Sequence, residues 1–369
     1  MILYRYITKE IFLTFLAVIF VLLFVAMSNH FARLLADVAA GQLSPTFVVK
    51  IIILYLPELF ANICPLALFI SILLALGRMY GDSEMVVLYS CGIKWANVAK
   101  VVILIAVLFS IVITLFTLWI VPESVLLREE AFNEGEAIGV IQTVTPGRFQ
   151  LMNEGRLVFY VEDKDKKNSL NRVFIAQSPQ AVEVNSDWTI LTSDSAKIER
   201  KDYDGTFYLV LFDGHRYTGT PGKKDYTVVN FSEYGREIIS EQEELDDYDR
   251  IKPSLRLWKS DNHSDKAELQ WRLAIPISVL ILAILGVSLA KVSPRQGKYA
   301  KLLPAILLYI VYYNLINVSK RWIAVGKISP DVGIWWVHLI FLTLGILLFA
   351  KESGFFFKLF YNRFRRSKV

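Results

Sequence analysis

The chain has 369 residues, 54% of them hydrophobic, and its mean hydropathy of +0.43 is too high for a soluble domain of this size. The composition therefore indicates a polytopic membrane protein. The net charge of +5 divides unevenly, because the block from Val121 to Asp265 carries 18 basic and 27 acidic residues while the remainder carries 22 and 8. An acidic soluble block inside a basic framework is typical of membrane topology and of contact with anionic headgroups, and it argues against nucleic-acid binding.

Three apolar segments of membrane length precede the polar block: Ile11 to Met27, Val48 to Leu76 and Val101 to Val121, the last closed by Pro122. The first follows a basic flank, as a secretory signal would. Its core is longer than that of a signal peptide, however, and no small-residue cleavage site follows. We therefore expect an uncleaved first span with its N-terminus in the cytoplasm.

The second segment contains an acid, Glu58, between Pro57 and Pro65, and both prolines are expected to kink the helix. A carboxyl group at membrane depth is costly and usually faces a protein interior or a cavity. Glu58 could serve function, satisfy a freed backbone group, or pair with a neighbouring helix. A structural role is favoured, because nothing else nearby supplies chemistry.

The polar stretch from Gly77 to Asn97 separates the second and third spans and predicts a short helix of its own, near residues 82–92. Ser83 is placed to cap its start and Gly92 to end it. Its apolar face comprises Met85, Val86, Leu88 and Tyr89, and the acids Asp82 and Glu84 lie at its N-terminal end, where negative charge suits the helix dipole. The pattern is equally typical of a contact for another protein and of an amphipathic helix lying on headgroups.

The block from Val140 to Phe231 predicts an inserted β-sandwich or jelly-roll domain, because short alternating segments recur between turn residues. The turn signals are Pro146-Gly147, Asn153-Glu-Gly155, Asp204-Gly205 and Asp213-Gly214. The segment from Ser232 to Asp265 is acidic and is expected to be a solvated connector. Neither cysteine, Cys64 or Cys91, lies in this block, so no disulfide can form within it.

Three further apolar segments complete six predicted spans: Leu273 to Ala290, Leu302 to Val318 and Val332 to Ala350. The expected organisation is three spans and the short helix in residues 1–121, the β-jelly-roll domain and its connectors in 122–265, and three spans with a basic tail in 266–369. Lysines and arginines in the short loops place both termini and the helix near 82–92 in the cytoplasm, and the β domain outside it.

The sequence contains no motif for covalent chemistry. No Gly-Lys pair completes a nucleotide-binding loop, and no Cys/His metal cluster or hydrolase elbow is present, so we expect no catalytic residue, metal or cofactor. Four cations lie at the outer ends of the spans: Arg33 after the first, Lys320 and Arg321 after the fifth, and Lys327 in the next loop. They are expected either to snorkel to headgroups or to bind a phosphorylated amphiphile that leaves the bilayer.

Four separated motifs resemble the LptF/LptG permeases of the bacterial lipopolysaccharide export system, and the resemblance covers essentially the whole chain. They are RYITKEIF (Arg5 to Phe12), MYGDSEMVVLYSCGIK (Met79 to Lys94), AELQWRLAIP (Ala267 to Pro276) and SPRQGKYAKLLPAILLY (Ser293 to Tyr309). The last motif, together with AELQWR, favours the LptF-type subunit.

The resemblance implies a non-catalytic permease subunit of an ATP-driven ABC transporter that extracts lipopolysaccharide from the inner membrane. Its implied partners are an LptG-type paralogous permease, a dimeric cytoplasmic LptB-type ATPase, an LptC-type membrane-anchored jelly-roll protein and an LptA-type periplasmic bridge. The ATPase would dock at Asp82, Glu84, Met85 and Leu88, and the lipid phosphates would bind Arg33, Lys320, Arg321 and Lys327. The alternative function is a non-transporting scaffold or a mechanotransmission-type ABC subunit that binds a periplasmic partner through its β domain.

Overall fold

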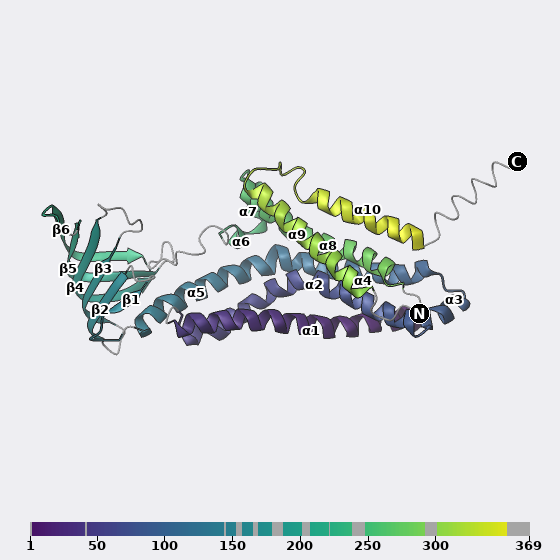
Figure 1. The fold of residues 1–369 in the computed structure, drawn as a ribbon, viewed down its shortest axis with the longest axis horizontal. Helices are drawn as coiled ribbons and strands as arrows, with labels where there is room; N and C mark the ends of the chain where they lie inside the picture. Colours follow the sequence, from purple (N-terminus) through teal and green to yellow (C-terminus); the bar gives the residue numbers. More distant parts are fainter. Residues whose placement is uncertain are drawn as a thin grey trace. The chain divides into compact units, whose positions relative to one another are not determined.

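The computed structural model describes residues 2–40, 43–143, 145–152, 157–164, 169–178, 187–200, 207–220, 222–237, 248–291 and 301–352 (Figure 1). The basic tail, most of the loop before the fifth span and the predicted turns at Asn153-Glu-Gly155 and Asp204-Gly205 lie outside the described residues. The chain forms two compact units. The first comprises Met1–Asn29, Leu54–Leu127 and Leu245–Val369, and the second comprises His30–Ile53 and Arg128–Glu244.

The described residues contain six helical segments long and apolar enough to cross a membrane, as the sequence predicts. They are α1 (Ile2–Ala39), α2 (Val48–Gly81), α4 (Trp95–Leu115) with its continuation, α8 (His263–Leu289), α9 (Leu302–Ala324) and α10 (Trp335–Glu352). Several are longer than a bilayer requires. α1 would extend about 57 Å at 1.5 Å per residue, against a hydrocarbon core of about 30 Å.

The third span does not end at Pro122, and the prediction on this point was wrong. α4 continues through the π-helical turn η2 (Phe116–Ile120) into α5 (Val121–Thr143). Pro122 lies just after the π-helical turn, and turns of this kind occur as single bulges inside longer helices. The carbonyl oxygen of Leu118, one turn before the proline, accepts a hydrogen bond of 2.7 Å from the Ser254 hydroxyl.

α8 is the centre of the first unit. Of its most apolar 18 residues, 72% are buried, whereas the corresponding figure for α1 is 17%. α4, α9 and α10 all pack against α8 (Figure 1). Close packing is possible partly because Gly286 on α8 faces Ile72 and Phe69 of α2, where an added Cβ would lie 3.2 Å from Ile72 Cγ2. α8 therefore forms the core against which α2, α4, α9 and α10 pack.

The second unit contains a β domain, as the sequence predicts, and its described residues form one six-stranded antiparallel sheet with the strands in chain order. The strands are β1 (Gln150–Met152), β2 (Leu157–Lys164), β3 (Leu170–Gln177), β4 (Trp188–Arg200), β5 (Phe207–Gly219) and β6 (Tyr226–Glu237). Its core includes Phe159, Val161, Ile175, Leu191 and Leu211. The turn at Pro146-Gly147 is present, with Gly147 at a φ of +77°.

The predicted turn at Asp213-Gly214 was wrong, because these residues lie within β5. Ser193 pairs with Gly214 and Ser195 with Phe212, while Asp213 is left out of the ladder and has a φ of +48°. A Cβ on Gly214 would lie 2.1 Å from the carbonyl oxygen of Thr192. The glycine therefore marks an irregularity inside a long strand, a position that turn composition alone does not distinguish from a hairpin.

The connector after the β domain is not solvated throughout, contrary to the expectation from its acidic composition. Residues 238–247 lie outside the described part of the chain. From Tyr248 onward the connector forms two short helices, α6 (Tyr248–Ile251) and α7 (Ser254–Lys259), directly before α8. Asn262 caps the start of α8 by accepting a hydrogen bond from the backbone N–H of Ser264.

Candidate functional site

The short helix predicted between the second and third spans is α3 (Glu84–Ser90), and it is fixed to the bundle by one face. Met85 is fully buried, Leu88 and Tyr89 are partly buried, and the Tyr89 hydroxyl lies 2.8 Å from the Tyr80 hydroxyl. Gly92, with a φ of +85°, follows the helix as expected. α3 is therefore an ordered part of the bundle surface.

Ser83 does not cap α3 with its side chain, although the sequence favours it for that role. It has a φ of +62° and makes no side-chain capping hydrogen bond, and its carbonyl oxygen accepts from Val86 N and Val87 N instead. The connection from α2 is very tight, since Asp82 N still bonds to Arg78 O. This tight turn forces Ser83 into the left-handed conformation, whereas an N-cap residue normally has an extended backbone.

The outward face of α3 differs from the one the sequence predicts. Val86 and Val87 are 56% and 61% exposed, whereas Met85 is inaccessible. Glu84 Oε2 accepts a hydrogen bond of 2.9 Å from the Tyr6 hydroxyl on α1. Sequence reasoning missed Val87, and it also missed Tyr6, although Tyr6 and Glu10 are spaced to share one helix face.

A second contact fixes α1 close to α3. Glu10, one turn after Tyr6, forms an ion pair with Arg78 near the end of α2. The apolar side chains Ile7 and Ile11 of the same helix are fully buried in the core cluster that also contains Met85. The structure thus places the acidic end of α3 against the beginning of the first span.

The predicted phosphate-binding cations differ in their surroundings. Lys320 on α9 has its Nζ atom 2.6 Å from Glu268 Oε2 and 5.1 Å from the centroid of the Trp271 ring. Arg321 and Lys327 are exposed and form no ion pair with any described residue. Arg33 is exposed on α1 and belongs to the second unit. Among these four cations, Lys320 alone therefore has an acidic partner in the described part of the chain.

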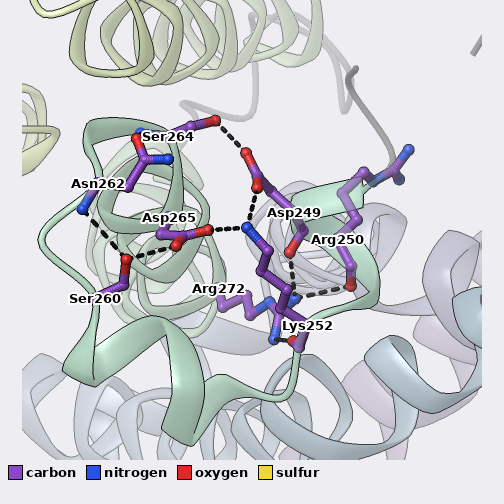
Figure 2. A network of polar contacts seen from close by, with 8 residues as sticks. All are labelled: Asp249, Arg250, Lys252, Ser260, Asn262, Ser264, Asp265 and Arg272. Atoms are coloured by element: carbon purple, nitrogen blue, oxygen red, sulfur yellow. Dashed lines mark hydrogen bonds and ion pairs between the residues drawn. The ribbon is translucent and has the colours of Figure 1, made fainter. Parts of the chain in front are cut away.

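A buried polar cluster lies where the connector meets α8, and its centre is Arg272. This side chain is only 3% exposed. Its guanidinium group donates to Glu268 Oε1 (3.0 Å) and Ser254 Oγ (2.8 Å). It also donates to the backbone carbonyl oxygens of Asp249 (3.4 Å), Arg250 (2.8 Å) and Lys252 (3.0 Å), as Figure 2 shows in part. Arg272 therefore attaches both α6 and α7 to the fourth span.

A second part of the cluster is formed by Lys252 and two acids. Lys252 Nζ donates to Asp249 Oδ1 (2.7 Å) and to Asp265 Oδ1 (2.6 Å), while the Ser260 hydroxyl donates to Asp265 Oδ2 (2.5 Å) (Figure 2). Burial disfavours the charged ammonium group, but the hydrogen bonds to the two carboxylates outweigh this effect and raise the pKa of Lys252. The pair of carboxylates therefore keeps Lys252 protonated.

Glu58, the acid at membrane depth, forms an ion pair with Arg250 of α6. Of the roles that the sequence left open, pairing with a neighbouring helix is therefore the one observed. Glu58 and Arg250 line a small cleft together with Asn62, Trp271 and Arg272. No group of three or more His, Cys, Asp or Glu side chains in the described part of the chain is placed to hold a metal ion.

Comparison with known proteins gives a match along most of the chain. Residues 5–351 match the model of the family described as lipopolysaccharide export system permease LptF/LptG. The lipopolysaccharide export system permease proteins LptF of Escherichia coli (strain K12) and of Shigella flexneri are each 31% identical over 350 residues, which is 94% of this chain and 94% of each relative. With this match, six described helices long and apolar enough to cross a membrane, and an inserted β domain, the chain belongs to the LptF/LptG family of lipopolysaccharide export permeases.

Proposed function

We propose that this chain is the LptF-type permease subunit of an ATP-driven ABC transporter that extracts lipopolysaccharide from the bacterial inner membrane. In this proposal it is a multi-pass, non-catalytic subunit, and a dimeric LptB-type ATPase in the cytoplasm hydrolyses ATP. An LptG-type permease forms the other half of the membrane channel. The lipid then passes through an LptC-type jelly-roll protein to an LptA-type periplasmic bridge.

The observation that carries this proposal is the construction of α3. Its inner face is fixed through Met85, while Val86 and Val87 remain exposed next to Asp82 and Glu84. A buried anchor beside an exposed apolar and acidic surface suits the docking of another protein on a rigid support. Since the sequence contains no nucleotide-binding loop, a docked ATPase supplies the work.

External work is needed because lipopolysaccharide has several acyl chains. Each buried CH₂ group contributes about 0.8 kcal/mol, so removal from the bilayer costs far more than a few ionic contacts return. The exposed cations Arg33, Arg321 and Lys327 suit contact with the phosphates of the lipid, since arginine can form two parallel hydrogen bonds to a phosphate. Lys320 would have to break its ion pair with Glu268 before it could also contact the lipid phosphates.

The proposed orientation places both termini and α3 in the cytoplasm and the β domain in the periplasm. It follows from the excess of lysine and arginine in the short loops on the side of α3. The β sheet ends in β6, whose exposed residues include Tyr226, Val228 and Val229. An edge strand of this kind suits pairing with a strand of a periplasmic partner.

The experiment is to purify the full chain with its native companions in mild detergent and to identify the proteins and lipids that accompany it. We expect an ATPase, a second permease and lipopolysaccharide. Glu84→Ala should lower the recovery of the ATPase, whereas Glu352→Ala, which removes an acid paired with Lys291, should not. The proposal is wrong if no nucleotidase accompanies the wild-type chain, or if the isolated chain hydrolyses ATP unaided.

A further inference from the structure

The short helix α7 exposes two large apolar side chains that no described part of the chain covers. Leu255 and Trp258 are 70% and 71% exposed, whereas Leu257 between them is fully buried. Leu255 and Trp258 are three residues apart, so they lie on the same side of the helix. One face of α7 therefore packs into the bundle and another displays an apolar pair.

α7 is held firmly in this position. The Ser254 hydroxyl accepts a hydrogen bond of 2.8 Å from Arg272 and donates one of 2.7 Å to the Leu118 carbonyl oxygen. Arg272 also donates to the backbone of Lys252, just before the helix, which Figure 2 shows in its polar surroundings. The outward position of Leu255 and Trp258 is thus fixed by contacts to the third and fourth spans.

The exposed face of α7 is also positively charged. Arg256 and Lys259 are exposed, and their side chains form no hydrogen bond or ion pair with a described residue. The nearest acid that follows, Asp261, forms an ion pair with Lys266. The combination of tryptophan, leucine and two unpaired cations on one short helix is typical of a segment that lies at a membrane interface.

The position of α7 along the spans agrees with an interfacial depth. α8 begins at His263, shortly after α7, and its 27 residues would extend about 40 Å, longer than a hydrocarbon core of about 30 Å. The Leu118 carbonyl lies about 35 Å along the third span from Trp95, by the same rise per residue. In Figure 1, α7 lies at the opposite end of the first unit from α3.

We infer that α7 is an interfacial anchor that docks on the phospholipid surface of the leaflet on the side away from α3. Leu255 and Trp258 enter the boundary between headgroups and acyl chains, and Arg256 and Lys259 bind phospholipid phosphates. The anchor fixes the depth at which the connector from the β domain joins the fourth span. The assignment to the outer, periplasmic leaflet rests on the orientation in the proposed function.

The first test measures depth with spin labels in the full chain, purified with its companions and placed in nanodiscs of phosphatidylethanolamine and phosphatidylglycerol without lipopolysaccharide. Single cysteines replace Leu255, Arg256, Trp258 and Lys259 in a background that carries Cys64→Ala and Cys91→Ser. We expect labels at 255 and 258 to collide more often with oxygen than with a water-soluble nickel chelate. Labels at 256 and 259 should show a lower oxygen-to-nickel ratio.

Three outcomes would overturn the inference. Equal access of the nickel chelate to all four positions would show that α7 faces water. Labels at 255 and 258 that are immobilised and shielded from both reagents would show a protein partner on this face. If the contact appears only after lipopolysaccharide is added, the occupant is that lipid, and the assignment to phospholipid is wrong.

A second measurement avoids cysteines on α7. In nanodiscs that contain brominated phospholipid, Trp258→Phe should remove part of the lipid-quenched tryptophan fluorescence, and Trp188→Phe in the β domain should not. Equal quenching losses in the two variants would contradict the anchor.

A membrane-impermeant thiol reagent applied to intact spheroplasts tests the orientation separately, because Arg256→Cys should react while Cys91 should not. Reaction of Cys91 alone would refute the proposed topology and the assigned leaflet, whereas the depth data test the anchor itself.

Discussion

Arg272 shows how one buried side chain can organise the junction between a soluble domain and a membrane span. Its guanidinium group bonds to one carboxylate, one hydroxyl and three backbone carbonyls. Lysine cannot replace it, because an ammonium group lacks the planar set of five donors. Glu268 lies four positions before Arg272 in the same AELQWR motif, a spacing that the sequence shows. The other acceptors are 18 to 23 positions away in the chain and are not visible in the sequence.

We predict that Arg272→Ala destabilises the chain by about 3–5 kcal/mol, because it leaves Glu268 and several carbonyl groups buried with fewer partners. Arg272→Lys should restore only part of this loss. Thermal unfolding of the detergent-purified protein measures the effect. The control is Lys291→Ala, which removes an ion pair whose lysine side chain is 48% exposed and should cost at most about 1 kcal/mol. Equal destabilisation by the two alanine variants would contradict this assignment.

The pairing of Lys320 leads to a prediction about lipid binding. Lys320 is neutralised by Glu268 at 2.6 Å, whereas Arg321 has no acidic partner in the described part of the chain. We therefore expect Arg321→Ala to lower photocrosslinking of lipopolysaccharide more than Lys320→Ala does. Glu268→Gln should increase the contribution of Lys320, because it removes the competing charge. The prediction fails if Lys320→Ala causes the larger loss in the otherwise unchanged chain.

Tyr6 positions the acid that we propose as the ATPase contact. Tyr6→Phe keeps the ring and removes the hydrogen bond to Glu84, which we expect to weaken ATPase docking by about 1 kcal/mol, or roughly fivefold. In a Glu84→Ala background the same change should have no further effect, because Tyr6 acts through that carboxylate. Tyr4→Phe, which alters an exposed neighbour, is the control. Additive losses in the double variant would show that Tyr6 has a separate role.

At the level of elements, α3 shows what pattern analysis can and cannot give. The polar interruption, the apolar spacing and Gly92 predict a short helix at the right place. The outward face was not predictable, because Tyr89 turns toward Tyr80 at the end of α2, and Met85 and Leu88 join a core cluster that also contains residues of α1. Hydrophobic spacing identifies a face that can be buried, and only tertiary packing decides which partner buries it.

Gly214 provides a prediction for the β sheet. A Cβ at this position would meet the Thr192 carbonyl oxygen at 2.1 Å and the Phe231 ring at 2.7 Å, so Gly214→Ala should destabilise the sheet by about 1–3 kcal/mol. Limited proteolysis of the full chain should then cleave the β domain faster. Gly235→Ala on β6, where the nearest atom would be 3.8 Å away, is the matched control. Equal cleavage of both variants would argue against close packing at Gly214.

At the level of the whole molecule, the membrane makes part of the architecture predictable. A span needs about 20 apolar residues, so six spans and an inserted polar domain follow from hydropathy. Hydropathy does not predict how far the helices extend beyond the length that a bilayer requires. α5, for example, continues past Pro122, although the composition predicts that the span ends there. The polar cluster was also missed, because it joins Glu58, Arg250 and Arg272 from three separate segments.

The spans are buried in the bundle to different extents, and this difference affects which of them can move. α8 is surrounded by neighbours, and Arg272 attaches it to the connector that precedes it, so a tilt or rotation of α8 would break many contacts at once. α1 has far fewer such restraints and is linked directly to the acid of α3. In the proposed assembly, a displacement of α3 by the docked ATPase would be passed to α1 through the hydrogen bond between Tyr6 and Glu84, while α8 stays in place.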